Sequence, residues 1–137
     1  MGHVLCCWEL GAGYGHLYRL LPIISELLRI GHHVSLVSKD AERARLVFDT
    51  LDIEIISAPD ITSPPKSFSL SQNYSQNLLR NGYWHLPSLH QRLVDWLALF
   101  AVCQPDFILA EHAPTALLAA KLTKLSRGVI GTGFTVP

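Results

Sequence analysis

The chain has little cysteine, no net charge and no clustering of basic residues. It has 137 residues, with three cysteines (Cys6, Cys7 and Cys103) and eleven basic against eleven acidic side chains. The cysteines lack the C-x-x-C spacing of a zinc site and the seven histidines do not fall at zinc-site spacings, so no metal is expected. The absence of basic clusters argues against nucleic acid as a partner.

Two further absences concern the compartment. The N-terminus lacks the charged start, apolar stretch and small-residue cleavage site of a signal peptide. No window of about 18 apolar residues is present, so no membrane-spanning helix is expected. Cys6 and Cys7 lie in an apolar run typical of buried thiols in a reducing compartment. These observations predict a cytoplasmic protein. Attachment to a membrane surface is the alternative, although no basic amphipathic helix supports it.

Short apolar runs alternate with stretches of helical periodicity. Strands are predicted at residues 3–10, 32–38, 53–57, 105–111 and 128–134, with helices at 17–28, 41–50, 77–102 (broken near Pro87) and 114–126. This order predicts one α/β domain, residues 1–137, with a Rossmann-like, doubly wound parallel sheet. Residues 59–77, rich in Ser, Pro and Asn, are expected to form a solvated connection, with a substrate-facing loop as the alternative.

The stretch GAGYGH, residues 11–16, directly follows the first predicted strand. Gly11 and Gly13 match two positions of a dinucleotide-binding G-x-G-x-x-G, and Asp40 is placed for the ribose-binding acid, but His16 stands where the third glycine belongs. Alternatively, the glycines only permit a tight turn and His16 packs or caps a helix. Ligands of open α/β sheets nevertheless bind at the carboxyl ends of strands, where this loop lies.

Residues 11–38, GAGYGHLYRLLPIISELLRIGHHVSLVS, resemble the N-terminal signature of the GT-B glycosyltransferases, especially the UDP-glycosyltransferases and the MurG-like enzymes. PDFILAEHAPTALLAAKL (residues 105–122) and GVIGTGF (128–134) resemble the fourth strand, the next helix and the fifth strand of those enzymes. The resemblance leaves out residues 59–102, which are expected to vary with the acceptor. It implies an incomplete N-terminal, acceptor-binding half of a GT-B fold, without the donor-binding C-terminal domain.

The resemblance also implies a chemistry and its residues. His16 would be the general base for the acceptor hydroxyl, and Glu111, where the family more often has Asp, would orient it. The resemblance places further residues along the loops that face acceptor and phosphate: Gly11, Gly13, Gly15, His112, Gly131, Thr132 and Gly133. For His112, a plain loop position before a helix is an equal alternative. The reaction would transfer a sugar from a nucleotide sugar, expected to be a UDP-sugar, with inversion of the anomeric centre. It would need no metal or other cofactor.

The expected acceptor is a small or lipid-like molecule, because apolar residues such as Phe68, Leu70, Tyr74 and Trp84 occur in the middle segment. The chain ends directly after a predicted strand, so a fragment of a longer enzyme, inactive alone, is expected. The alternatives are a non-catalytic, acceptor-presenting subunit or relic that needs a separate donor-binding partner, a GT-B-type sugar epimerase, and an NAD-binding domain.

Overall fold

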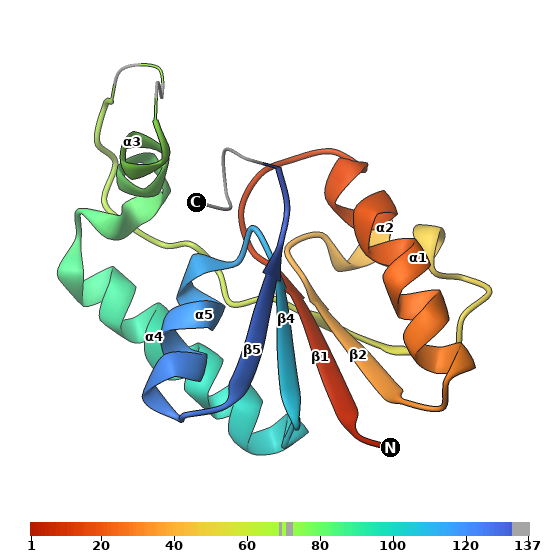
Figure 1. Ribbon diagram of the computed structural model, residues 1–137. Helices are drawn as coiled ribbons and strands as arrows, with labels where there is room; N and C mark the ends of the chain where they lie inside the picture. Colours follow the sequence, from red (N-terminus) through yellow and green to blue (C-terminus); the bar gives the residue numbers. More distant parts are fainter. Residues whose placement is uncertain (69, 71–72, 133–137) are drawn as a thin grey trace.

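The computed structural model describes the chain except for residues 69, 71–72 and 133–137. Within the described residues, five parallel strands form one sheet in the order β3-β2-β1-β4-β5 (Figure 1). The strands are β1 (His3–Trp8), β2 (His33–Ser38), β3 (Glu54–Ser57), β4 (Phe107–Glu111) and β5 (Ser126–Ile130). The predicted α/β class and doubly wound parallel sheet are confirmed.

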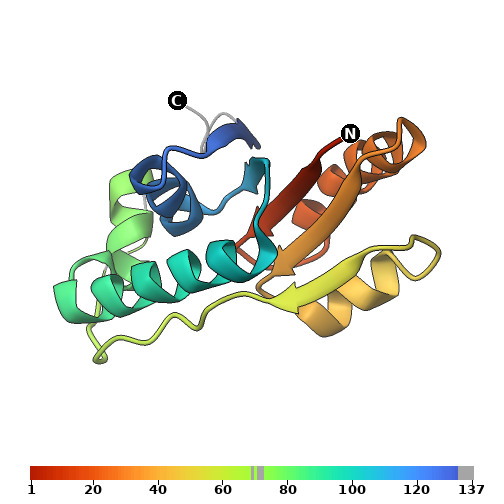
Figure 2. The ribbon, with the colours of Figure 1, turned by 90° about the horizontal axis from the view of Figure 1, so that it is seen from below.

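Helices cover both faces of this sheet. They are α1 (Gly15–Arg29), α2 (Ala41–Val47), α3 (Tyr74–Leu78), the wide turn η1 (Leu79–Tyr83), α4 (Leu86–Cys103) and α5 (Pro114–Leu122). Helices α1 and α2 lie on one side and α4 and α5 on the other, whereas α3 rises beyond the carboxyl ends of the strands (Figures 1 and 2). The result is three layers with the sheet in the middle.

The pleat of β1 divides the core into two halves. Leu5 and Cys7 belong to the half under α4 and α5, and Val4, Cys6 and Trp8 belong to the half under α1 and α2. Successive side chains of a strand point to opposite faces, so a strand covered on both faces is apolar throughout. Burial raises the pKa of the Cys6 thiol to about 12, as suits a packing residue and not a reactive one.

Some predicted boundaries are wrong. The fifth strand begins at Ser126 and not at residue 128, and α5 ends at Leu122. The chain turns between them at Lys124, whose φ of 58° is left-handed although it is not glycine. The break predicted near Pro87 is confirmed: His85 is extended, with φ of −105° and ψ of 95°, and α4 begins directly after it, with Pro87 in its first turn. A further kink lies at Gly82, with φ of 85°. The last residues of the predicted fifth strand lie outside the described part.

The middle segment has no regular structure between β3 and α3 in the residues described, which agrees with the predicted connection. Trp96 and Phe100 are buried in the core. Trp84 is only half-buried, with the Lys66 ammonium 4.6 Å from the centre of its ring. It packs against Lys66 and Phe68 of the connecting segment and lies outside the buried core.

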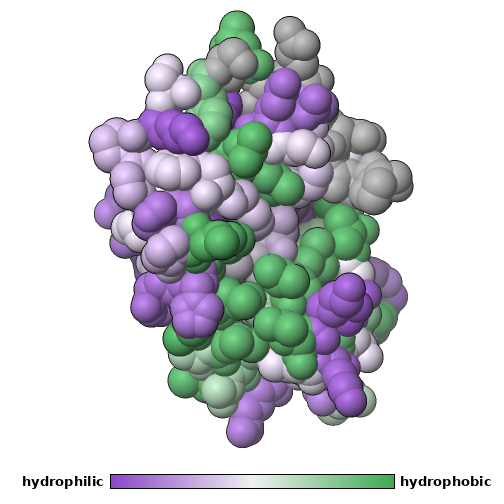
Figure 3. Space-filling model, turned by 90° about the vertical axis from the view of Figure 1, so that its left-hand side faces the viewer, coloured by the Kyte–Doolittle hydropathy of each residue, from purple (hydrophilic) through white to green (hydrophobic). Residues whose placement is uncertain are grey.

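The outer side of α4 and α5 has an apolar and a more polar half. Figure 3 shows apolar side chains gathered over the lower half of this side and more polar ones toward the upper half. The large apolar side chains exposed on α4, α5 and β5 include Val94, Val102, Leu118, Leu122 and Val129. Across the described part of the chain, every helix falls short of the length and apolar character needed to cross a membrane.

Candidate functional site

The candidate site lies where β1, β2 and β4 end. Two backbone hydrogen bonds tie the loops together there: Leu10 N donates to the His112 carbonyl and Lys39 N to the Trp8 carbonyl, both at 2.9 Å. This edge of a parallel sheet is the usual ligand position in open α/β folds. These bonds fix the glycine loop (residues 11–16), which follows β1, between the ends of β2 and β4.

The pleat brings an aromatic ring and a carboxylate to the same side of this edge. Trp8 and Glu111 are the last residues of β1 and β4 and pair in register. Both side chains are almost fully buried, and α1 covers them. The His16 ring lies over the Trp8 indole, with ring centres 5.2 Å apart and planes inclined by 21°. Trp8 therefore sets the plane of the His16 ring.

His16 and Glu111, the predicted catalytic pair, are in direct contact. His16 Nδ1 lies 2.5 Å from Glu111 Oε2, and Arg19 donates from Nη1 to Glu111 Oε1. The longer side chain of glutamate thus reaches the histidine. With Nδ1 bound to the carboxylate, Nε2 is the ring nitrogen left for a ligand. Sequence reasoning missed Arg19, which its position three residues after His16 on the same helix face could have indicated.

Gly11 makes the space in front of His16 Nε2. Its φ is +94°, and a Cβ there would lie 2.3 Å from Nε2. Glycine is thus needed both for the backbone conformation and for the close approach. Gly13 has a φ of +83°, and a Cβ on Gly13 or on Gly15, the first residue of α1, would meet no atom within 4 Å. Of Gly11 and Gly13, only Gly11 borders the histidine closely.

His112 faces the same space from the other side. Its ring centre lies 5.7 Å from that of His16, and its Nδ1 lies 3.3 Å from the position of a Gly11 Cβ. Only 8% of His112 is exposed, and Nδ1 has no hydrogen-bond partner in the described structure. Asn77 Nδ2 lies 3.3 Å from its Nε2.

Burial, reinforced by the nearby His16, lowers the pKa of His112 and favours the neutral ring. If Nε2 accepts from Asn77, the ring proton is on Nδ1. His112 would then present a buried N–H donor toward Gly11, next to the Nε2 of His16. The plain loop position weighed for His112 in the sequence does not account for this unpaired nitrogen.

The remaining predicted residues follow β5. Because Ile130 pairs with Glu111, Gly131 and Thr132 leave the sheet at the edge where His16 and Glu111 lie. Gly133 lies outside the described residues. The roles assigned to these residues stay predictions.

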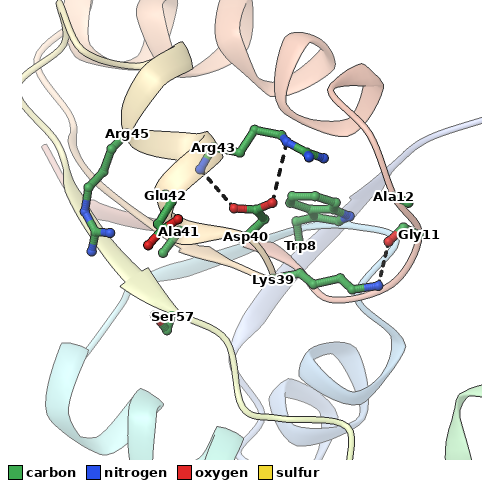
Figure 4. A pocket seen from close by; sticks show the side chains of 10 residues that line it. All are labelled: Trp8, Gly11, Ala12, Lys39, Asp40, Ala41, Glu42, Arg43, Arg45 and Ser57. Carbon is green, nitrogen blue, oxygen red and sulfur yellow. Dashed lines mark hydrogen bonds and ion pairs between the residues drawn. The ribbon is translucent and has the colours of Figure 1, made fainter.

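Lys39 lines three neighbouring hollows. The first, of about 430 Å³, lies between the glycine loop and α2, and Figure 4 shows its lining. Lys39 Nζ donates to the Gly11 carbonyl at 2.6 Å, and Asp40 caps α2 by accepting from Arg43 N at 2.9 Å. A second hollow, of about 310 Å³, is bordered by Glu9. A third, also about 430 Å³, extends toward η1.

A second buried carboxylate was not anticipated from the sequence. Glu9 faces α4 and α5, where its Oε2 accepts from Thr115 N at 2.9 Å and its Oε1 lies 3.7 Å from Arg92 Nε. Arg92 also donates to the Asn81 carbonyl at 3.0 Å and lies over the Tyr83 ring. Burial raises the pKa of Glu9, against the opposing effects of Thr115 and Arg92. The alternation after Trp8 indicates the direction of Glu9, but nothing local indicates its partner.

Comparison with known proteins gives similarity in structure alone. No family model and no curated protein matches the sequence. Among solved structures, MurG of Acinetobacter baumannii matches with 16% identity and a TM-score of 0.66, over 96% of this chain and 35% of that one. A glycosyltransferase of kitacinnamycin matches with 21% identity and a TM-score of 0.61, over 95% and 30%. The UDP-GlcNAc 2-epimerase of Neisseria meningitidis, bound to UDP-GlcNAc, matches with 18% identity and a TM-score of 0.59, over 93% and 31%.

The chain spans about a third of the length of each of these proteins. Their agreement with nearly the whole chain confirms the resemblance at the level of architecture. The chain has the Rossmann-like fold of one part of a GT-B glycosyltransferase.

Proposed function

We propose that this chain is the acceptor-binding part of a glycosyltransferase that moves a sugar from a nucleotide donor to an acceptor hydroxyl. The observation that carries the proposal is the His16–Glu111 contact of 2.5 Å, together with the space that Gly11 leaves before His16 Nε2. A ring oriented through one nitrogen and open at the other is what a general base requires.

The chemistry follows from this arrangement. The acceptor O–H gives its proton to His16 Nε2 as its oxygen bonds to the anomeric carbon of the sugar. The bond from that carbon to the diphosphate breaks, and the nucleoside diphosphate leaves with the bonding electrons. Attack opposite the leaving group inverts the anomeric centre. The Glu111 carboxylate stabilises the imidazolium formed, and Arg19 holds that carboxylate in place.

His112 would hold the acceptor oxygen. A hydroxyl in the space beside Gly11 can accept from His112 Nδ1–H while it donates to His16 Nε2, so both its proton and one lone pair are positioned. This role would satisfy the ring nitrogen that has no partner among the described residues.

The donor, which we propose to be a UDP-sugar, would bind to a separate, donor-binding domain. A sugar epimerase is the second candidate, because a UDP-GlcNAc 2-epimerase is among the structural neighbours. An NAD site has less support, since the Asp40 carboxylate is already bonded to Arg43 at the start of α2. A subunit that only presents acceptor would bind it without transfer.

The test uses the product of the complete reading frame, assayed for UDP release from UDP-glucose and UDP-GlcNAc with a panel of hydroxyl acceptors. Release should require an acceptor, and His16→Ala should lower its rate by at least about 100-fold, the usual contribution of a general base. His33→Ala is the matched control, because His33 is exposed at the start of β2. It should leave the rate unchanged.

Other outcomes assign other functions. Conversion of UDP-GlcNAc to its 2-epimer without acceptor would replace transfer by epimerisation. Acceptor binding without UDP release from any donor would indicate a presenting subunit. Near-normal transfer by His16→Ala would remove His16 as the base.

A further inference from the structure

The third hollow differs from the other two in its charge. Its lining comprises Gly11, Ala12, Lys39, Asn77, Arg80 and Asn81. Two cations and two amides thus face a space of about 430 Å³ that no carboxylate lines, whereas acidic residues line both neighbouring hollows. The volume is that of a small-molecule site.

The two cations of this hollow are not neutralised by a direct ion pair, although Lys39 also borders the two hollows that acidic residues line. Neither Lys39 nor Arg80 makes an ion pair with any residue that the structure describes. Lys39 Nζ donates one of its three N–H groups to the Gly11 carbonyl (Figure 4), so two N–H groups remain for a ligand. Arg80 lies on η1 and borders the hollow from the opposite wall. In a chain of zero net charge, such an unbalanced pair favours an anion.

The asparagines add a donor to the same space. Asn81 Nδ2 donates to the Asn77 carbonyl at 2.8 Å, and Asn77 Nδ2 lies 3.3 Å from His112 Nε2. Asn81 Nδ2 also donates to Asn77 Oδ1 at 3.2 Å, so both of its hydrogens are used, whereas Asn77 Nδ2 keeps one hydrogen for a ligand. Two cations with a further N–H donor match a phosphate ester, with a charge of about −1.5 to −2, better than a single carboxylate.

The hollow adjoins the candidate catalytic pair. Gly11 lines the hollow and also borders His16 Nε2, while Asn77 lines it and contacts His112. An anion bound between Lys39 and Arg80 would therefore belong to the molecule whose hydroxyl reaches His16.

We propose that the acceptor carries a phosphate ester, and that Lys39 and Arg80 bind this group in the hollow beside Gly11. The assignment to the acceptor rests on the proposed function, whereas the existence of the anion site does not. The predicted lipid-like acceptor is compatible with it, provided that the lipid bears a phosphate.

The anion site can be tested on the full chain with inorganic phosphate as the probe, titrated while backbone amide shifts are recorded. Binding should saturate, and Lys39→Met and Arg80→Met should each weaken it about tenfold, the effect of one charge-assisted hydrogen bond. Lys121→Met and Arg127→Met are matched controls, because both residues are exposed and distant in sequence from the hollow. They should bind phosphate as the unmodified chain does.

Each outcome decides a separate point. Unsaturable binding, or binding that neither Lys39→Met nor Arg80→Met weakens, would overturn the site. UDP that displaces phosphate and binds at least tenfold more tightly, with the same dependence on both cations, would assign them to the donor and overturn the acceptor phosphate. Phosphate binding as expected, in a complete protein that transfers no sugar, would sink the proposed function and leave the anion site standing. Thermal unfolding at an unchanged midpoint shows that the variants are folded.

Discussion

Two buried glutamates end neighbouring stretches of the sheet and face opposite layers. Glu111 on β4 faces α1 and is bonded through both oxygens, to His16 and to Arg19. Glu9, one residue beyond β1, faces α5 and α4, where one oxygen accepts from Thr115 N and the other lies 3.7 Å from Arg92. The first carboxylate holds a side chain that borders the space beside Gly11, and the second lies between a strand end and two helices.

The difference lies in what each partner can do. His16 and Arg19 are partly exposed, with 18% and 34% of their side chains open to solvent, so the Glu111 cluster reaches the surface. Arg92 is 2% exposed, and its pairing with Glu9 is internal. Substitutions in the two clusters should therefore separate loss of function from loss of stability.

The largest effect is expected from Arg92→Met. It leaves the Glu9 carboxylate buried without its counter-charge, and breaking such a pair costs about 3–5 kcal/mol. Urea unfolding measures this loss directly. The double variant Glu9→Gln/Arg92→Met should recover part of it, because no charge is then left in the interior. A loss below about 1 kcal/mol for Arg92→Met would show that the pair contributes little.

The next effect concerns activity. Glu111→Gln keeps the shape of the side chain but removes the charge that stabilises an imidazolium, so UDP release by the complete protein should fall at least about 100-fold, or about 2.7 kcal/mol in the barrier. Glu9→Gln is the matched control and should retain the rate within about threefold, since Glu9 contacts neither histidine. Equal losses in the two variants would erase the functional distinction between the carboxylates.

The Glu111 cluster was accessible from the sequence because a short-range pattern places each of its two main residues at the same edge of the sheet. A period of two along residues 107–111 places Glu111 on the same face as Phe107 and Leu109, toward α1. A histidine at the start of the helix after a glycine loop then lies at the same edge. The resemblance to GT-B enzymes predicted that Glu111 orients His16, and the structure shows the two side chains in contact.

The Glu9 cluster was not accessible, because Arg92 lies within a helix and not at the end of a strand. Arg92 is 83 positions after Glu9 in a helix whose direction across the sheet depends on packing by Trp96 and Phe100. No short-range pattern encodes that direction. The start of β5 was missed for a related reason: Lys124 takes a left-handed conformation that its residue type does not announce. Lys39 was missed as well, since its contact with a backbone carbonyl leaves no sequence signature.

A smaller effect should distinguish two glycines beside the Glu111 cluster. Gly11→Ala and Gly13→Ala both place a side chain at positive φ, which costs about 1 kcal/mol each. Gly11→Ala must also displace His16, so its unfolding free energy should fall by about 2 kcal/mol, and the His16 ring resonances should shift. Gly13→Ala should leave those resonances in place. Identical spectra for the two variants would mean that Gly11 does not define the space before Nε2.

The smallest effect is a dependence of stability on pH that differs in sign between the buried Glu9 and the exposed Glu26. Burial raises the pKa of Glu9 above 4.5, so the folded chain keeps that proton to higher pH than the unfolded chain. The stability of the unmodified chain relative to Glu9→Gln should therefore fall as pH rises from 4.5 through the raised pKa. Glu26 provides the opposite case, because its contact with Arg29 lowers its pKa. Stability relative to Glu26→Gln should rise as pH increases toward 4.5, and parallel slopes in urea unfolding would contradict the internal placement of Glu9.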